Sequence, residues 1–487
     1  MKKTVRLLSL FLALLMLVST FAACGGTGED EESKPANDTV ATTDEGEKGL
    51  PALNWDGQEY RILGEESSTE WKHNFEVYRE EMPEDVVGKA VYERNQSIYD
   101  EYGIYVQGYL TAKAPNKAKT MLESGEDLYD LLLLPPEDHH PLAMSGYLLD
   151  IYGLDYIDVE ADGWQAYANK QLTMGGKLYY TTNKFLLQDK NRSWALFYNR
   201  DLAKALNLGY FETLVFNGEW TVDKLVELGK KATSDSDGVV GMTLEDNWGV
   251  GTGTVYSFCQ FAYGAGFRLT DHGSDGFPSL VGASDKIIQI LDKVYSLTAN
   301  TDVYFCDAYY GSTNWDYCSD HGFMAGRFLV LSVPVSSYSS LTEKSNFTVG
   351  VLPNPKCDKD QEDYYAIPNL GNGSLLSVPA SVIDTTFAGF ALQAITMESV
   401  DTSYNAYIET KCKLQDAYDE DSAKCLDIIF DGVVYDIGFV SDIGGLGAML
   451  RGLGDMKTNT YARLYDRLKK IAEKEIIKIR ETYAALG

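Results

Sequence analysis

Between Gln58 and Pro136 the sequence alternates short apolar runs with helix-like segments, and this alternation restricts the fold more than any other feature. The run 128–134 is mostly apolar and ends at two prolines, which is typical of a strand covered on both faces in a parallel sheet. Residues 84–102 carry apolar side chains at three- and four-residue intervals and end before Gly103, which suits a helix stop. The expected order is strand 60–63, helix 84–102, strand 104–108, helix 115–124 and strand 128–134. Such an order predicts an α/β fold.

In open α/β sheets, ligands gather at the carboxyl ends of the strands. Here those ends are residues 64–67 and 135–138, and both are rich in acidic side chains. We therefore expect part of a ligand site at this edge.

The same rhythm returns further along the chain. Residues 195–199 predict a strand and 201–208 a helix, while Thr221 is expected to cap a helix that ends near Ala232. Trp220 is expected to pack on Leu225 as a hydrophobic staple, and so to be structural. Residues 460–486 predict a long amphipathic helix.

The chain starts with a basic segment, an apolar stretch of about a dozen residues, and Ala22-Ala23 before Cys24. This order indicates a secretory signal peptide, 1–23, which is too short to span a bilayer. Cys24 followed by two glycines resembles a bacterial lipobox, although Phe21 stands where leucine is usual. Cys24 is therefore the expected lipidation site, with palmitate among the expected acyl groups. The alternative is an ordinary signal peptide with an incidental cysteine.

Residues 24–52 are acidic and polar, so we expect a disordered linker there. The remainder exceeds the usual size of a single core, which predicts two domains. A formal net charge of −30 argues against nucleic-acid binding, because phosphate contacts need basic surface.

Six cysteines follow Cys24, at irregular spacings that suggest neither a disulfide framework nor a zinc site. A bridge between Cys412 and Cys425 stays possible; otherwise these are expected to be small buried side chains. His139-His140 is expected to be a surface loop pair. Asp235–Gly238 looks like part of an EF-hand loop, but the register places Thr233 and Leu244 where carboxylates are required. No metal and no cofactor are expected.

Enzyme motifs are equally sparse. The sequence has no nucleophile elbow, zinc-protease helix or phosphate-binding loop, and the alternating glycines 249, 251 and 253 follow no clear strand. Paired carboxylates for glycoside hydrolysis leave no motif, since their separation is spatial, so a secreted glycan hydrolase stays an alternative.

Six segments, taken in order, resemble the extracellular solute-binding proteins of carbohydrate-type ABC transporters (family 1-like). They reach across most of 54–487. The segments are LYDLLLLPPEDHHPLAMSGYLLDI (128–151), SWALFYNRDLAKALNLG (193–209), GEWTVDKLVELGKKAT (218–233), HGFMAGRFLVLSV (321–333), VGVLPNPK (349–356) and CLDIIFDGVVYDIGFV (425–440).

The resemblance implies a two-lobed periplasmic-binding-protein-like fold of type II, with a hinge and a ligand cleft between the lobes. We expect lobe one to comprise 53–156 plus 321–380, and lobe two 157–320 plus 381–487. The resemblance also implies a monomeric, non-enzymatic receptor that is lipid-anchored at the extracytoplasmic side of the membrane. Such a receptor delivers a carbohydrate, expected to be an oligosaccharide, to the permease subunits. An adhesin or sensor with the same fold is a further alternative.

Sugar rings lie on aromatic faces, and their hydroxyls need polar groups in fixed positions. Trp71 lies in the loop that follows the first strand, and Trp248 lies in a Gly/Thr-rich segment that reads as irregular. Trp194 opens a strand, and Trp315 precedes the expected return to lobe one. The predicted ligand-binding residues are Glu65, Trp71, Trp194, Trp248, Trp315, Asp316 and Asn372. The turn with Asn372 can equally be a plain turn.

Overall fold

The computed structural model describes residues 49–66, 74–307, 317–371 and 373–486, all of which belong to one compact unit, Glu45–Gly487. The predictions for Cys24, Trp71, Trp315, Asp316 and Asn372 lie outside the described residues. So do the signal peptide and nearly all of the linker.

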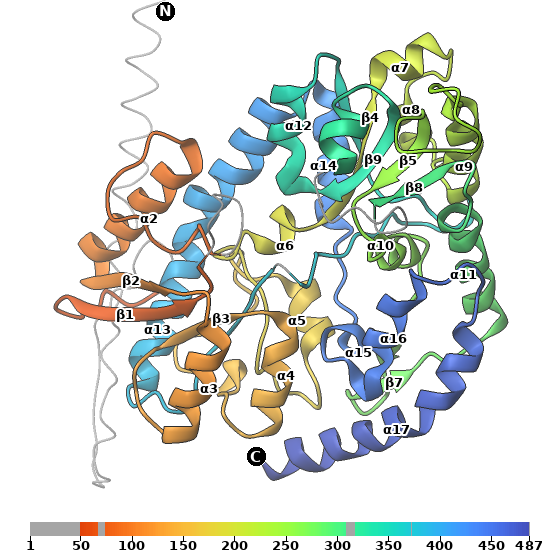
Figure 1. The fold of residues 1–487 in the computed structure, drawn as a ribbon. Coiled ribbons are helices and arrows are strands. Elements are labelled where there is room, and N and C mark those ends of the chain that lie inside the picture. Colours follow the sequence, from red (N-terminus) through yellow and green to blue (C-terminus); the bar gives the residue numbers. More distant parts are fainter. Residues whose placement is uncertain (1–48, 67–73, 308–316, 372, 487) are drawn as a thin grey trace, which may run out of the picture. The chain divides into compact units, whose positions relative to one another are not determined.

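The first sheet contains the predicted βα alternation (Figure 1). Strand β1 (Gln58–Gly64) lies between two parallel neighbours, β2 (Ile104–Leu110) and β3 (Leu131–Leu134). Strand β11 (Leu375–Ser377) joins the free side of β3 in antiparallel orientation, which gives the order β11-β3-β1-β2. The predicted α/β fold is therefore confirmed.

Local signals define the helices of this part. The Asp85 side chain accepts the Gly88 N–H (2.7 Å) at the start of α2 (Val86–Tyr102), and Gly103 ends the helix with φ 64°. The other two helices in this part are α3 (Ala114–Ser124) and α4 (Pro136–Met144).

The second sheet has five strands in the order β10-β4-β9-β5-β8. Strand β4 is antiparallel to β9 and β10, whereas β5 is parallel to β8 and β9. The bounds are β4 (Trp194–Asn199), β5 (Trp248–Thr252), β8 (Tyr304–Cys306), β9 (Phe328–Pro334) and β10 (Val349–Leu352). A separate hairpin pairs β6 (Thr270–His272) with β7 (Pro278–Leu280).

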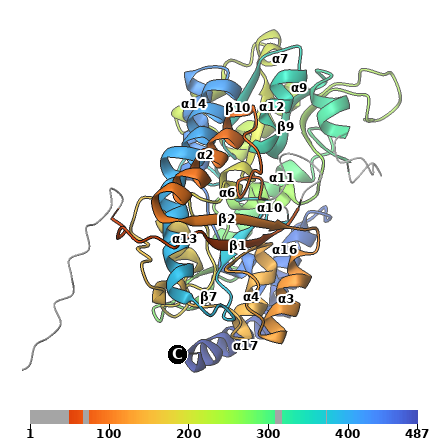
Figure 2. The ribbon, with the colours of Figure 1, turned by 90° about the vertical axis from the view of Figure 1, so that its left-hand side faces the viewer.

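Strands β9 and β10 thus share a sheet with β4 and β5, although the sequence prediction groups residues 321–380 with the first lobe. Helix α13 (Thr385–Ser399) packs on the first sheet instead, through Phe387 and Tyr60, whose ring centroids are 6.1 Å apart. Figure 2 shows α13 running beside α2. The lobe boundaries themselves stay a prediction.

The remaining helices connect and cover these sheets. They are α5 (Ala166–Leu172), α6 (Gln188–Asn191), α7 (Arg200–Ala205), α8 (Phe211–Phe216), α9 (Val222–Ala232), α10 (Ser257–Gly264), α11 (Asp285–Thr298), α12 (Tyr338–Lys344), α14 (Glu420–Asp431), α15 (Ile437–Val440), α16 (Leu446–Leu453) and α17 (Tyr461–Ala485). Short 3₁₀ turns are η1 (Ile151–Gly153), η4 (Val335–Ser337) and η7 (Ile443–Gly445), and π-helical turns are η3 (Cys318–Phe323), η5 (Val400–Tyr404) and η6 (Ala406–Asp416).

Several local predictions are confirmed. The Thr221 side chain caps α9, and α17 covers nearly all of the predicted C-terminal helix. Trp220 is fully buried and donates its indole N–H to the Pro353 carbonyl (2.9 Å).

In the part of the chain that the structure describes, no helix has the length and apolar character of a membrane span.

The six cysteines after Cys24 are all buried, and none of them forms a disulfide, so Cys412 and Cys425 are not bridged. They serve as small buried side chains, as expected.

Two of the three alternating glycines lie within the second sheet, and Gly253 directly follows β5, which corrects the prediction that they follow no clear strand. Gly249 and Gly251 belong to β5, and a Cβ on Gly249 would stand 2.4 Å from the Cα of Gly229 in α9. Because Gly229 and Gly249 carry no side chains, the backbones of α9 and β5 can come into contact there.

We predict that Gly249→Ala destabilises the protein by about 1–3 kcal/mol, because backbone atoms cannot yield to the added methyl group. Thermal unfolding measures the effect. The control is Gly452→Ala in α16, where a Cβ meets open space and helix propensity favours alanine. Equal melting temperatures for the two variants would contradict the contact.

Candidate functional site

The carboxyl ends of β1 and β3 are adjacent, because the two strands pair in parallel. Glu65 directly follows β1, and Asp138 lies in the first turn of α4, directly after β3. Burial raises the pKa of Glu65, and the nearby Asp138 carboxylate raises it further. Burial also raises the pKa of Asp138, with a smaller contribution from Glu137. The structure thus brings together the two acidic strand ends that the sequence singled out.

Asn74 completes this edge. Its side chain is fully buried, and its Nδ2 donates to the Glu65 carbonyl (3.4 Å). The amide sits over the end of β1, since a Cβ on Gly64 would stand 2.7 Å from the Asn74 Nδ2. We call Glu65, Asn74 and Asp138 the edge cluster.

A second group of polar side chains lies where the chain passes from the first sheet to the second. The fully buried Glu76 accepts the Leu187 N–H (3.3 Å) and the Gln188 Nε2–H (3.1 Å). Gln188 in turn accepts from the Arg192 Nε (3.4 Å). We call Glu76, Gln188 and Arg192 the crossing cluster.

Burial dominates the electrostatics of this cluster. It raises the pKa of Glu76, although the hydrogen bonds that Glu76 accepts and the nearby Arg94 oppose the shift. Burial also lowers the pKa of Arg192 to about 10, with Tyr407 and Glu76 opposing. At neutral pH this guanidinium therefore stays protonated.

Backbone hydrogen bonds hold residues 367–369 against residues 192–194. The Arg192 carbonyl accepts the Asn369 N–H (2.8 Å), and the Trp194 N–H donates to the Ile367 carbonyl (3.0 Å). Gly373 lies here too, since its Cβ would stand 3.7 Å from the Arg192 side chain. The predicted turn around Asn372 thus begins at a residue bonded to the crossing cluster.

Two of the predicted aromatic contacts are buried. The Trp248 ring has no exposed surface, donates to the Thr243 carbonyl (2.9 Å) and packs on Phe305 with centroids 5.4 Å apart. Because β5 begins at Trp248, the expectation of an irregular exposed segment is wrong. Trp194 is 6% exposed, at the start of β4.

His139 and His140 are not a surface pair, contrary to the prediction. Both are buried in α4, and the His139 Nε2 lies 3.1 Å from the carbonyl oxygens of Leu134 and Leu375. The ring therefore joins β3 to β11. Their sequence neighbours gave no hint of this, because β11 arrives from far along the chain.

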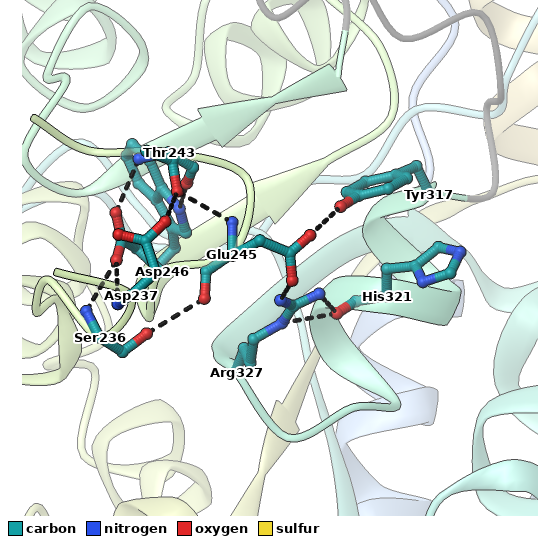
Figure 3. A network of polar contacts seen from close by, with 9 residues as sticks. Ser236, Asp237, Thr243, Glu245, Asp246, Tyr317, His321 and Arg327 are labelled. Atoms are coloured by element: carbon teal, nitrogen blue, oxygen red, sulfur yellow. Dashed lines mark hydrogen bonds and ion pairs between the residues drawn. The ribbon is translucent and has the colours of Figure 1, made fainter. Parts of the chain in front are cut away.

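Asp235 and Asp237 of the EF-hand-like segment gather with Asp246, which lies beyond it. Asp235, Asp237 and Asp246 offer carboxylate oxygens within 4.8 Å of one another. Asp246 already accepts backbone N–H groups of Ser236 (2.7 Å), Asp237 (3.3 Å) and Thr243 (2.7 Å), as Figure 3 shows in part. Burial opposes these bonds, yet they hold the pKa of Asp246 below its usual value. The prediction that no metal binds stays a prediction.

The same loop is tied to the segment that leads into β9. Glu245 accepts from the Tyr317 hydroxyl (3.0 Å) and pairs with Arg327, which also donates to the His321 carbonyl (Figure 3). Tyr317 stacks on the His321 ring, with centroids 4.7 Å apart. These contacts fix a surface loop.

Sequence reasoning missed Asn74, Glu76 and Arg192. No motif surrounds them. Asn74 and Glu76 lie in the long segment between the predicted strand 60–63 and helix 84–102, and Arg192 lies just before the predicted strand 195–199. Carboxylates, amides and a guanidinium are the planar polar groups that hydrogen-bond hydroxyls in small-molecule sites. The edge and crossing clusters together therefore form the candidate site.

No protein-family model matches the chain, and no curated protein matches it. Solved structures do match. A cyclo/maltodextrin-binding protein complexed with maltotetraose is 16% identical, with a TM-score of 0.56 over 86% of this chain and 97% of that one.

Two further structures agree. An ABC substrate-binding protein from Listeria monocytogenes in complex with cycloalternan is 14% identical, with a TM-score of 0.53 over 88% of this chain and all of the other. The maltose/maltodextrin-binding domain MalE from Bdellovibrio bacteriovorus, bound to maltotriose, is 15% identical, with a TM-score of 0.51 over 88% and 100%. The chain thus has the α/β fold of ABC-transporter solute-binding proteins.

We predict that the buried His140 makes the protein less stable in mild acid. Burial lowers the pKa of His140 to about 4, with Lys478 adding to the effect. Below about pH 6.5 the unfolded chain therefore binds a proton that the folded chain refuses. This contribution, at most about 3 kcal/mol, is complete above pH 6.5 and is lost as the pH falls toward 4.

The measurement is the free energy of unfolding between pH 4.5 and 7.5 for the wild type and His140→Leu. Carboxyl groups with raised pKa values, such as Glu65, titrate in both proteins, so the difference isolates the histidine. The variant should show the shallower loss of stability in acid; parallel curves would contradict the prediction.

Proposed function

We propose that this chain is the substrate-binding component of an ABC importer that captures a carbohydrate, specifically an oligosaccharide. The observation that carries the proposal is the fold match to binding proteins solved with maltotetraose, cycloalternan and maltotriose. The edge and crossing clusters support it, because they supply the planar polar groups that sugar hydroxyls need. The receptor performs no chemistry on its ligand.

In this proposal the carbohydrate lies at the carboxyl edge of the first sheet and against the crossing cluster. Trp71, Trp315, Asp316 and Asn372 remain proposed ligand contacts. Glu65, Trp194 and Trp248 also remain proposed contacts, although both tryptophan side chains are buried in the unliganded protein. Closure around the ligand follows from hinge motion, as in binding proteins of two lobes.

We propose further that Cys24 carries the lipid and that the acidic linker keeps the folded part clear of the membrane surface. A lipid-anchored receptor stays beside the permease to which it hands the sugar. The linker suits this role, because it holds almost no apolar side chains that could fold.

The ligand class is tested by thermal unfolding against maltotetraose, maltotriose and cycloalternan, with amino acids and short peptides as the comparison set. A ligand that binds only the folded state stabilises it by about 2.7 kcal/mol at a hundredfold excess over Kd. We expect a sugar to raise the melting temperature, and Glu65→Gln to reduce that rise. A shift with peptides and none with sugars would refute the carbohydrate assignment.

The anchor is tested by expressing the full chain and Cys24→Ala in a bacterial host supplied with a labelled palmitate analogue. We expect the label on the wild type and its loss in Cys24→Ala, since the acyl groups need the cysteine. The control variant, Cys357→Ser, removes a cysteine of the folded part and should keep the label. Persistent labelling of Cys24→Ala would exclude the proposed anchor.

A further inference from the structure

Glu76 is a fully buried carboxylate with no salt-bridge partner among the described residues. Its side-chain bonds go instead to the Leu187 N–H (3.3 Å) and the Gln188 Nε2–H (3.1 Å). Burying a charge in this way costs free energy that an apolar residue would avoid. What the carboxylate provides in return is a directional link between two distant parts of the chain.

The first of these parts is the segment 74–77, which is also held from its other side. Arg94, fully buried in α2, donates from Nη2 to the carbonyls of Glu76 (2.8 Å) and Val77 (3.0 Å). Its Nη1 reaches the hydroxyls of Ser399 (3.3 Å) and Ser403 (3.2 Å). Arg94 therefore holds the backbone of residues 76–77 against α2. The Glu76 side chain bonds other partners, Leu187 and Gln188.

The Glu76 carboxylate orients Gln188, its neighbour in the crossing cluster. Gln188 uses Nε2 to donate to Glu76 and Oε1 to accept from Arg192, so its amide is oriented by both neighbours. At the other end of the segment, Asn74 bonds the Glu65 carbonyl at the end of β1. A continuous chain of contacts thus joins the edge cluster to the crossing cluster, with Glu76 in its middle.

We propose that Glu76 is a positioning residue of the ligand site. Its carboxylate holds the edge cluster and the crossing cluster in one fixed geometry, so that their polar groups meet the same ligand. This role rests on the proposed function as far as the ligand is concerned. The positioning itself is a property of the unliganded protein and is measurable without any ligand.

The test combines Glu76→Gln with a compensating swap. The single variant sets an amide NH₂ against a donor, either the Leu187 N–H or the Gln188 amide. In the double variant Glu76→Gln/Gln188→Glu, residue 76 donates to residue 188 and still accepts from Leu187, while the carboxylate faces Arg192. Every hydrogen bond then has a donor and an acceptor again.

Hydrogen exchange of two amides is the readout. The Leu187 N–H bonds the Glu76 carboxylate, and the Val77 N–H bonds the Asn74 carbonyl (3.2 Å). We expect exchange of both to rise about tenfold in Glu76→Gln and to return in the double variant. Faster exchange at Leu187 alone, or no recovery in the double variant, would overturn the proposal. If the single variant does not fold, recovery of wild-type exchange in the double variant decides the question.

The matched control is Glu212→Gln, another buried carboxylate, which accepts from Tyr198 and Arg200 beside the second sheet. It should lower the melting temperature without changing exchange at Leu187 or Val77. Maltotetraose titrations form the second arm: affinity should fall about tenfold in Glu76→Gln and recover in the double variant. Unchanged affinity would overturn the role in binding, whereas a wild type that ignores every sugar would refute the proposed function and leave the exchange result standing.

Discussion

The arrangement of the candidate site depends on a few backbone hydrogen bonds between stretches of chain that pass from one sheet to the other. The bonds from Trp194 to Ile367 and from Asn369 to Arg192 bind two such stretches together. The Val335 N–H, directly after β9, also donates to the Ser193 carbonyl (2.9 Å). Backbone groups buried in this way must find partners. Once they have done so, the polar side chains on these stretches have little freedom left, and the crossing cluster is the result.

How well the sequence predicts this fold depends on how local each signal is. The helix α2 is recognised from its own residues, because its apolar side chains recur at three- and four-residue intervals and Gly103 ends it. The parallel order of β1, β2 and β3 follows from the apolar runs and the helices between them. Strand β11 gives no such signal: three residues, 375–377, become a strand only because β3 offers them a partner.

The candidate site also contains residues with a local sequence signal and residues without one. Glu65 and Asp138 are found from sequence because the ends of parallel strands meet at one edge. Glu76 is not found, since a lone glutamate in a connecting segment looks solvated until Gln188 and Arg94 surround it. For Trp248 the sequence prediction errs in the other direction. Its glycine-rich surroundings suggest an exposed loop, but Gly249 instead allows close contact between α9 and β5.

The late arrival of β11 bears on when the molecule can fold. His139 bonds a carbonyl of Leu375, which lies 236 residues further along the chain. Until that part has been synthesised, β3 remains an unpaired sheet edge and His139 lacks half of its contacts. Pairings between residues so far apart in sequence form slowly. Because every strand of the second sheet precedes β11 in the chain, the sheet that begins first is the last to be completed.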